Sequence, residues 1–274
     1  MSVLVMALPT PHEAEASNDV LYECVMGGSR IVGVGNGIVV KYGPRVQTTE
    51  ADSLAFVAAH TTLPVPKLLG TYIHDDIPYI VMSRIPGTPL ADLLPRMSLN
   101  EINLITTDLK SMMDELRALR ITDFETGSYV GSIGRQPCRD MLFRSGSESK
   151  GPFLTGEDMY ENIIERWTKL FESDLLSESS VQFTRRLYRE NSGNDIVFTH
   201  GDLDPRNILV ENGHVSGIVD WEQAGWYLEY WEYVKAMWGC VDAWETVWPL
   251  EVVKFVRPYD YIRLLDLPIR TAFQ

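Results

Sequence analysis

The sequence predicts an α+β protein with two lobes: a small lobe of antiparallel strands with one helix, and a larger, mainly helical lobe. Its length is the first indication, since 274 residues lie near the size at which a single hydrophobic core stops growing. The second indication is the pattern, because short apolar runs with hairpin turns fill the first third and helical spacing dominates after residues 83–88. We therefore expect lobes over residues 1–84 and 85–274.

The first third supplies the elements of the small lobe. A polar stretch over residues 12–19 is expected to be mobile. Two apolar runs then flank Asn36-Gly37, a pair that favours a type I′ hairpin because both residues tolerate positive φ. A helix with a threonine cap follows, and after Pro64 the chain returns to apolar runs separated by a polar turn. The expected elements are strands over 30–34, 37–42, 68–73 and 79–82 and a helix over 51–60.

The large lobe begins after Ser83–Gly87, which interrupts the pattern with Pro and Gly. Helical spacing predicts helices over residues 99–119 and 159–176. Between them, residues 127–156 are rich in Gly, Ser and Pro and carry little periodicity. We expect a long loop or an insertion on the substrate side there.

Charge and composition exclude several classes of protein. The chain has 24 basic and 38 acidic residues, a formal net charge of −14, which disfavours nucleic-acid binding and is compatible with a small cationic ligand. Its three cysteines are far apart and match neither a disulfide framework nor a zinc site. No apolar run reaches the roughly 18 residues of a membrane span, and the N-terminus does not resemble a signal peptide. The cytoplasm is the expected location.

Residues 196–222 carry the chemistry. An apolar strand runs into a polar turn, a short strand follows, and Asn212-Gly213 forms a second hairpin whose return strand ends at Asp220. This arrangement brings Asp202, Asn207 and Asp220 close together at one end of these strands. The set suits phosphoryl transfer, in which one Asp receives or orients the proton of the attacking hydroxyl while an Asn and a second Asp hold Mg²⁺.

The same residues resemble a known family. His200-Gly201-Asp202 with Asn207 is similar to the H-x-D-x-x-x-x-N loop of the protein-kinase-like fold, in the form found in aminoglycoside phosphotransferases and choline-kinase-like enzymes. Asp220-Trp221-Glu222 resembles the metal-binding D-F-G position. The resemblance is to the phosphotransferase enzyme family, particularly its fungal-type branch, and covers about residues 28–240. Its further matching segments are Val39–Pro44, Ile85–Gly87 and Trp226–Ala236.

The resemblance implies a nucleotide site between the lobes. Lys41 is expected to contact the α- and β-phosphates, with Glu50 as its ion-pair partner and Asp52 as the alternative. The linker residues Met82, Ser83 and Ile85 are expected to receive the purine, the last two through their main chain. ATP is the expected nucleotide, and GTP stays open. The phosphate-covering loop has two candidates, Gly27-Gly28-Ser29 and Gly33–Gly37.

The resemblance also implies roles in the catalytic loop. Asp202 is the expected base or orienting group, Asn207 and Asp220 hold the metal, and His200 supports the loop by hydrogen bonding. Glu222 is a candidate for a second metal position or for the acceptor. Asp204 and Arg206 either contact substrate or form a solvated pair.

An aromatic-rich segment follows the predicted metal ligand. Packing is one interpretation of its rings, and a cage for a cationic or aromatic acceptor is the other. The residues concerned are Trp221, Trp226, Tyr227, Tyr230, Trp231, Tyr233, Trp238, Trp244 and Trp248, with the acids Glu229, Glu232, Asp242 and Glu245.

The predicted function is Mg²⁺-dependent transfer of the ATP γ-phosphoryl group to a hydroxyl of a small molecule. The acceptor classes left open are aminoglycoside-like compounds, amino alcohols, sugars and secondary metabolites. The alternatives are a kinase-like scaffold that only binds, and one repurposed for a nucleotide-independent reaction on a natural product. The sequence does not predict an oligomeric state.

Overall fold

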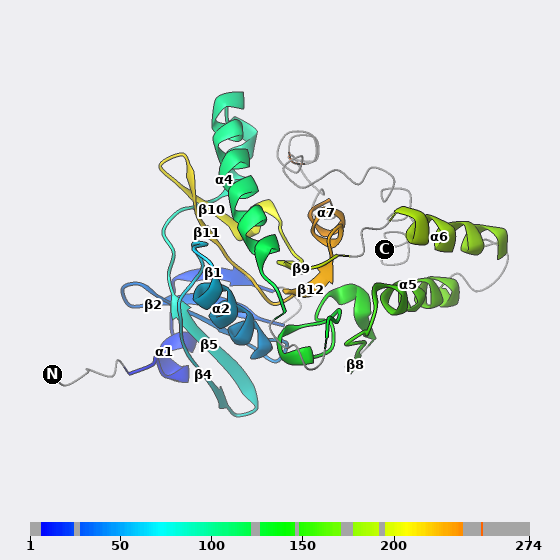
Figure 1. The fold of residues 1–274 in the computed structure, drawn as a ribbon. Helices are drawn as coiled ribbons and strands as arrows, with labels where there is room; N and C mark the ends of the chain where they lie inside the picture. Colours follow the sequence, from blue (N-terminus) through cyan, green and yellow to red (C-terminus); the bar gives the residue numbers. More distant parts are fainter. Residues whose placement is uncertain are drawn as a thin grey trace.

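The computed structural model describes residues 7–24, 28–121, 127–145, 148–170, 178–191, 195–237 and 248, and every structural statement below concerns this part of the chain. Figure 1 shows a sheet with a helix against it, joined to a second region of longer helices and short sheets. The predicted α+β class is confirmed.

The first sheet has five antiparallel strands in the order β1-β2-β3-β5-β4. The hairpin predicted at Asn36-Gly37 joins β2 and β3. The polar turn predicted after residue 73 joins β4 and β5 and is made by Asp75 and Asp76, which both have positive φ. The unpredicted strand is β1, whose four side chains are all exposed and therefore lack the alternation that marks a strand. The strands are β1 (Val20–Glu23), β2 (Arg30–Val34), β3 (Ile38–Tyr42), β4 (Leu68–His74) and β5 (Ile77–Ser83).

Residues 11–15 form a helix, so the expectation of a mobile stretch over residues 12–19 is wrong. Helix α1 (Pro11–Glu15) begins with a capping box between Thr10 and Glu13. Ser17 then donates its hydroxyl to the Gly33 carbonyl at 2.6 Å. The capping box and the Ser17 contact use polar side chains, which hydrophobic periodicity does not report.

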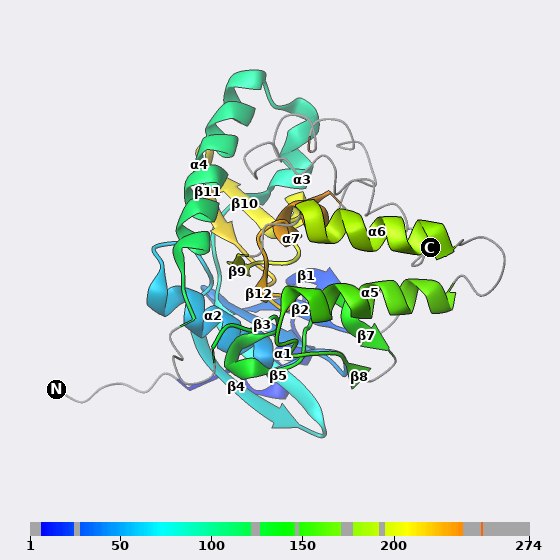
Figure 2. The ribbon, with the colours of Figure 1, turned by 45° about the vertical axis from the view of Figure 1, so that its right-hand side comes forward.

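The two faces of the sheet pack against different helices. Val39 and Ile80 point into the main core together with Leu54 and Val57 of α2 (Thr49–His60). The alternate strand positions point to the opposite face, where they pack under Ala14 of α1. Figures 1 and 2 show the sheet between these helices.

The second region begins after the linker at residues 84–87. Its longest helix, α4 (Leu99–Ala118), agrees with the predicted 99–119 and starts at a capping box of Ser98 and Glu101. Helix α5 (Gly156–Leu170) starts earlier than predicted, and residues 171–176 lie outside the described part. The remaining elements are β6 (Thr88–Pro89), α3 (Leu90–Leu93), η1 (Leu94–Arg96), η2 (Ile133–Arg135), η3 (Met141–Phe143), β7 (Arg144–Ser145), β8 (Glu148–Ser149), α6 (Glu178–Asn191), β9 (Ile196–Thr199), η4 (Pro205–Asn207), β10 (Ile208–Glu211), β11 (His214–Ile218), β12 (Gly225–Leu228) and α7 (Trp231–Ala236).

The segment predicted as a loop, residues 127–156, is tied to the core of this region. Val130 and Phe153 form an antiparallel bridge, and Gly131 pairs with Trp226 of β12. The segment is therefore packed against β12, the strand that follows Asp220 in the chain.

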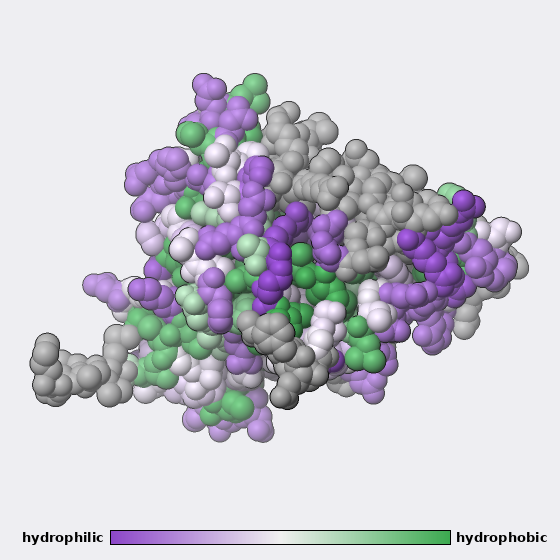
Figure 3. Space-filling model, in the orientation of Figure 1, coloured by the Kyte–Doolittle hydropathy of each residue, from purple (hydrophilic) through white to green (hydrophobic). Residues whose placement is uncertain are grey.

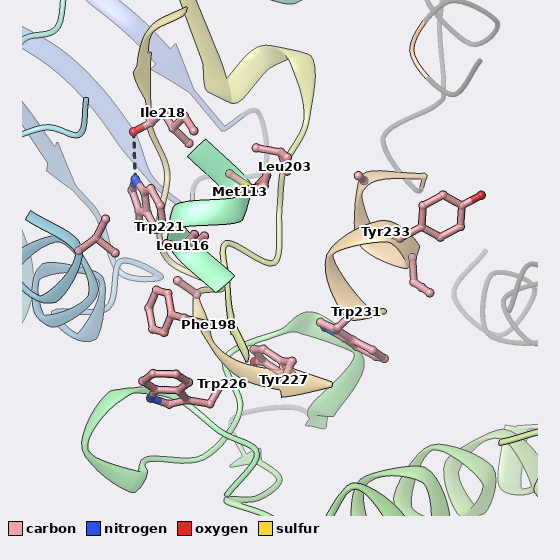
Figure 4. Close-up of a cluster of buried hydrophobic side chains, with 14 of the residues drawn as sticks. Met113, Leu116, Phe198, Leu203, Ile218, Trp221, Trp226, Tyr227, Trp231 and Tyr233 are labelled. Atoms are coloured by element: carbon pink, nitrogen blue, oxygen red, sulfur yellow. Dashed lines mark hydrogen bonds between the residues drawn. The ribbon is translucent and has the colours of Figure 1, made fainter. Parts of the chain in front are cut away.

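The aromatic segment is mainly core (Figure 4). Trp221 and Trp231 are fully buried, and the Trp221 indole donates to the Ile218 carbonyl at 2.9 Å. Tyr227, Tyr230 and Trp226 are at most 3% exposed, so these rings have no face open to an acceptor. The packing interpretation is confirmed for them and the cage interpretation is wrong, whereas Trp238, Trp244, Asp242 and Glu245 lie outside the described residues.

Hydrophilic residues dominate the described surface in Figure 3, with apolar residues in small separate patches. Within the described ranges, none of the helices has both the length and the apolar character needed to cross a bilayer.

Candidate functional site

A cleft of about 620 Å³ lies between the first sheet and the loops of the second region. The sheet and linker form one wall, and the loops after β9 and β11 form the other. Among the predicted residues of the loop after β9, His200 and Asp204 do not line it. The predicted site residues that line it are Lys41, Glu50, Met82, Ser83, Ile85, Asp202, Asn207 and Asp220.

Lys41 lies at the centre of a carboxylate cluster. Its Nζ is 2.7 Å from Glu50 Oε2, 2.8 Å from Asp220 Oδ1 and 3.0 Å from Glu222 Oε2. Lys41 and Glu50 are only 3% and 2% exposed. Of the two predicted partners, Glu50 is therefore the one in contact, whereas Asp52 is exposed.

The charges of this cluster are strongly coupled. Burial acts to lower the pKa of Lys41, but the charges of Glu50, Asp220 and Glu222 outweigh it and raise that pKa well above its ordinary value. Burial also raises the pKa of Glu50, against the opposing charge of Lys41. Lys41 is therefore a fixed positive charge within the cleft.

The catalytic loop follows β9 and turns at Gly201. This residue has φ of +79°, and a Cβ there would lie 2.7 Å from the Gln223 carbonyl oxygen, so only glycine fits. The buried His200 ring bridges two segments: its Nε2 donates to the Val219 carbonyl at 3.0 Å, and its Nδ1 accepts the Asp202 N–H at 3.2 Å. Burial lowers the pKa of His200, which keeps the ring neutral and suits both bonds.

Asn207 and Asp220 lie beside each other next to Asp202. The Asn207 amide donates to the Asp202 carbonyl at 2.9 Å and to its Oδ2 at 3.3 Å, which leaves the amide oxygen available. Val219 N–H donates to the Asn207 carbonyl at 2.9 Å and so fixes Asp220 nearby. Asp220 has φ of +64°, a costly conformation for a residue with a Cβ and one that clusters at functional sites.

The donor set fits Mg²⁺, which prefers carboxylate and amide oxygens. Glu50, Asp220 and Glu222 also bring oxygens within 4.8 Å of one another. However, the Lys41 ammonium lies within 3.0 Å of all three carboxylates and occupies the space between them. Asp220 also lies next to Asn207, so these two residues offer a carboxylate and an amide oxygen that could hold a metal ion away from the ammonium.

Burial raises the pKa of Asp202 to about 7, opposed by the charge of Lys235 and reinforced by Asp220. A carboxylate whose pKa is higher in the folded than in the unfolded state loses stability as pH rises from about 4 to about 7. Without nucleotide or metal, Asp202→Asn should therefore raise the Tm at pH 7.5 by about 2 to 4 °C, as expected from about 1 kcal/mol in a domain of this size. The gain should shrink as the pH of the melting experiment is lowered towards 4; an unchanged gain would contradict the assigned charge state.

Sequence reasoning missed the role of Glu232, which it named only among the acids that could hold an acceptor. Its carboxylate is 2% exposed and accepts the His200 N–H at 2.6 Å and the Gly201 N–H at 3.2 Å. Glu232 thus fixes the main chain that leads into Asp202. A charged residue between the apolar Trp231 and Tyr233 was the available signal, since buried carboxylates need partners.

Replacing Glu232 by Gln should slow turnover without weakening nucleotide binding. The amide keeps one acceptor but turns a donor towards the second N–H, so we expect a loss of about 2 kcal/mol in stability and about a tenfold lower kcat. Steady-state kinetics and thermal melting measure both effects. The matched control is Glu211→Gln at an exposed hairpin position; equal behaviour of the two variants would contradict the positioning role.

A second buried ion pair lies under the same loop. Lys235 Nζ is 3.2 Å from Asp140 Oδ1 and 3.3 Å from Gln223 Oε1. The other Asp140 oxygen accepts the Trp231 indole N–H at 2.9 Å. Helix α7 therefore holds both the catalytic loop and the 127–145 segment in place.

The linker presents main-chain groups to the cleft. Ser83 N–H donates to the Lys67 carbonyl at 2.9 Å, and Arg84 N–H donates to the Gly37 carbonyl at 2.8 Å. Ser83 lines the cleft, but its N–H is already bonded to Lys67 and so cannot donate to a purine. Met82 is 7% exposed at the inner end of the cleft.

The two candidate phosphate loops lie at opposite ends of β2 and β3. Arg30 pairs with Tyr42 beside Lys41, whereas Val34 pairs with Ile38 at the far end. Ser29 lines the cleft, and Gly27 lies outside the described residues. Gly33–Gly37 is therefore wrong as a phosphate loop and is the β2–β3 turn.

Asp204 and Arg206 form a bidentate pair at 2.7 and 3.0 Å. Asp204 is 3% exposed and also accepts the Arg206 N–H at 2.9 Å, so it caps η4. Of the two, only Arg206 lines the cleft.

Comparison with known proteins decides the family. The sequence model of the phosphotransferase enzyme family matches residues 43–252. The chain belongs to this family. It is 25% identical over 170 residues to an aminoglycoside 3'-phosphotransferase of Enterococcus faecalis, a match that covers 60% of this chain and just over half, 56%, of that relative.

Solved structures of this family share the fold. The apo structure of a thermostable mutant of aminoglycoside phosphotransferase APH(4)-Ia has a TM-score of 0.58 at 20% identity and covers 92% of this chain and 82% of its own. ADP-bound APH(2'')-Ib has a TM-score of 0.59 at 14% identity, covering 94% and 82%. The ternary complex of streptomycin, ATP and APH(2'')-IIa also gives 0.59 at 14% identity, covering 97% and 87%. The predicted two-lobed fold of the family is confirmed.

Proposed function

We propose that this family member is a Mg²⁺-dependent phosphotransferase that moves the γ-phosphoryl group of ATP to a hydroxyl of a small molecule. The observation that carries the proposal is the cleft in which Asp202 and Asn207 face the Lys41–Glu50 ion pair and Asp220. These are the groups that phosphoryl transfer needs: a proton acceptor, oxygen ligands for a metal and a fixed cation for the phosphates. The boundary that we propose between the nucleotide lobe, 1–84, and the acceptor lobe, 85–274, crosses this cleft.

In the proposed reaction, the acceptor oxygen bonds to the γ-phosphorus while the bond from that phosphorus to the β–γ bridging oxygen breaks. ADP leaves with the electron pair of that bond, and Asp202 orients the acceptor hydroxyl and takes its proton. Lys41 neutralises phosphate charge. Mg²⁺ held by Asn207 and Asp220 would neutralise the charge that develops on the phosphate oxygens. Positioning and electrostatic stabilisation supply most of the acceleration.

The linker favours ATP over GTP as the donor. The Ser83 carbonyl can accept a hydrogen bond from the exocyclic amino group of adenine, whereas guanine carries a carbonyl at that ring position and would face it with a second acceptor. Relatives of this fold have been solved with ADP, AMP-PNP and ATP. ATP and Mg²⁺ are abundant in the cytoplasm, where we place the reaction.

The acceptor class is set by the second region of the chain. Relatives of this fold have been solved with hygromycin B, streptomycin and gentamicin. For this chain we propose a hydroxyl-bearing small molecule, with aminoglycosides, amino alcohols, sugars and secondary metabolites as the candidates to test.

The experiment is a screen of such hydroxyl compounds with Mg·ATP, in which ADP formation and the phosphorylated product are followed by mass spectrometry. A product formed only with nucleotide supports the proposal. Tight nucleotide binding with no transfer to any compound would favour a binding role, and a product formed without nucleotide would favour a repurposed scaffold.

A further inference from the structure

Two neighbouring arginines in residues 127–145 have no carboxylate partner in the part of the chain that the structure describes. Arg139 Nη1 donates to Gln47 Oε1, an uncharged acceptor, and its Nε is buried without a hydrogen-bond partner. Arg144 makes no side-chain hydrogen bond or ion pair within the same ranges. Such a pair is unexpected in a chain with 38 acidic and 24 basic residues, because a partly buried guanidinium without a counter-ion costs free energy.

A rigid turn holds the two arginines together. Asp140, which is fully buried, accepts the Leu142 N–H at 2.9 Å and is anchored by Trp231 and Lys235. Phe143 N–H donates to the Asp140 carbonyl at 3.0 Å and closes the turn, so Arg139 and Arg144 leave from its two ends. Burial, together with the charge of Arg144, lowers the pKa of Arg139, as expected for two cations that share one environment.

The pair is connected to the proposed phosphoryl-transfer centre through the start of α2. Arg139 contacts Gln47, whose carbonyl accepts the Glu50 N–H at 3.1 Å, and Glu50 is the partner of Lys41. One helical turn separates Gln47 from Glu50, which places the Arg139 guanidinium on the order of 10 Å from Lys41. On the other side, Gly131 pairs with Trp226 in the strand after Asp220. Figure 2 shows this segment (green) passing α2 and leading into α5.

The start of α2 adds a third positive feature. Thr48 at its N-cap makes no side-chain capping bond, and the buried Thr49 hydroxyl has no hydrogen-bond partner among the described residues. The partial positive charge of a helix N-terminus attracts anions, and the Glu50 and Ala51 N–H groups donate to the Gln47 and Thr48 carbonyls. Thr48 and Thr49 lie within two residues of Gln47, the residue that Arg139 contacts.

We propose that Arg139, Arg144 and the start of α2 bind an anionic group, a phosphate or a carboxylate, on the acceptor molecule. This inference rests on the proposed function, because it assigns to the acceptor the space beside the transfer centre. It gives the acceptor at least one group of opposite charge to the amines of the aminoglycosides bound by the relatives. Two guanidinium groups recognise phosphate and carboxylate by the same forked hydrogen bonds.

The test is calorimetric titration of the full chain with inorganic phosphate and, in a parallel arm, with acetate, while ADP and Mg²⁺ fill the nucleotide cleft. Wild type should bind the preferred anion at one site. Arg139→Gln and Arg144→Gln should each weaken that binding about tenfold or more, the loss of one charge-assisted contact, and Arg139→Lys should lie between. Arg135→Gln is the matched control, since its guanidinium lies over the Tyr129 ring in the same segment.

Anion binding that is the same in wild type and in the folded Arg139→Gln and Arg144→Gln variants would overturn the inference. A wild-type protein that binds neither anion would also overturn the inference, because the protein itself would then neutralise Arg139 and Arg144. If ADP fails to bind, the proposed function fails, and the anion titration is repeated on the nucleotide-free protein. In the nucleotide-free protein, the Lys41→Met substitution removes anion binding by the cleft. Any anion binding that the arginine substitutions then weaken is due to Arg139 and Arg144.

Discussion

Asp202→Asn should lower kcat by a factor of about 10² to 10⁴, the usual contribution of a positioned general base. The amide retains the shape of the side chain and can still accept from Asn207, but it cannot take the acceptor proton. Because Lys41, Asp220 and the linker are unchanged, the affinity for Mg·ATP should stay within about twofold of wild type. ADP formation at saturating acceptor measures the first quantity, and nucleotide titration measures the second.

The conservative control for this variant is Asp204→Asn. Asp204 lies two residues away and is also buried, but its carboxylate caps η4 and pairs with Arg206. The variant Asp204→Asn should lower the free energy of unfolding and leave kcat within about tenfold of wild type. If Asp202→Asn turned over as fast as Asp204→Asn, the assignment of Asp202 as the base would be wrong.

Asp220→Ala should abolish the Mg²⁺ dependence of nucleotide binding. The variant removes the carboxylate that faces Asn207 and one of the three charges around Lys41. We expect Mg·ATP to bind at least about tenfold more weakly than to wild type, a loss of about 1.4 kcal/mol or more, while metal-free ATP binds about equally. Displacement of a fluorescent ATP analogue with and without Mg²⁺ measures the difference.

The variant Glu222→Ala distinguishes the contribution of Asp220 from that of Glu222. Glu222 is 37% exposed and also contacts Lys41, so its removal changes the charge around the lysine by the same amount. A metal dependence retained in Glu222→Ala and lost in Asp220→Ala would assign the ligand to Asp220. Loss in Glu222→Ala alone would move the metal to the Glu222 side of Lys41.

The catalytic loop was predictable because its geometry is local. Asp202, Asn207 and Asp220 fall within 19 residues, and the Asn212-Gly213 hairpin between them fixes the return of the chain. Lys41 and Asp220 lie 179 positions apart, so only the resemblance to a family brought them together. Their contact at 2.8 Å shows that the motif carried information that periodicity could not.

The other features of the site and fold could not be predicted from the sequence, for physical reasons. Glu232 and Lys235 support the site through hydrogen bonds to His200 and Asp140, which lie 32 and 95 residues away in the sequence. No local sequence pattern indicates contacts at such distances. Strand β1 has no buried face and thus no alternation. For the described rings of the aromatic segment, the cage interpretation was wrong because composition alone does not say which way a ring points, and these rings point into the core.

The most direct test of the central claim is a calorimetric titration of wild-type protein with ATP in the presence and absence of Mg²⁺. The arrangement of Lys41, Asn207 and Asp220 predicts one ATP per chain, bound at least about tenfold more tightly with Mg²⁺. No ATP binding in either condition would contradict the proposed phosphotransferase.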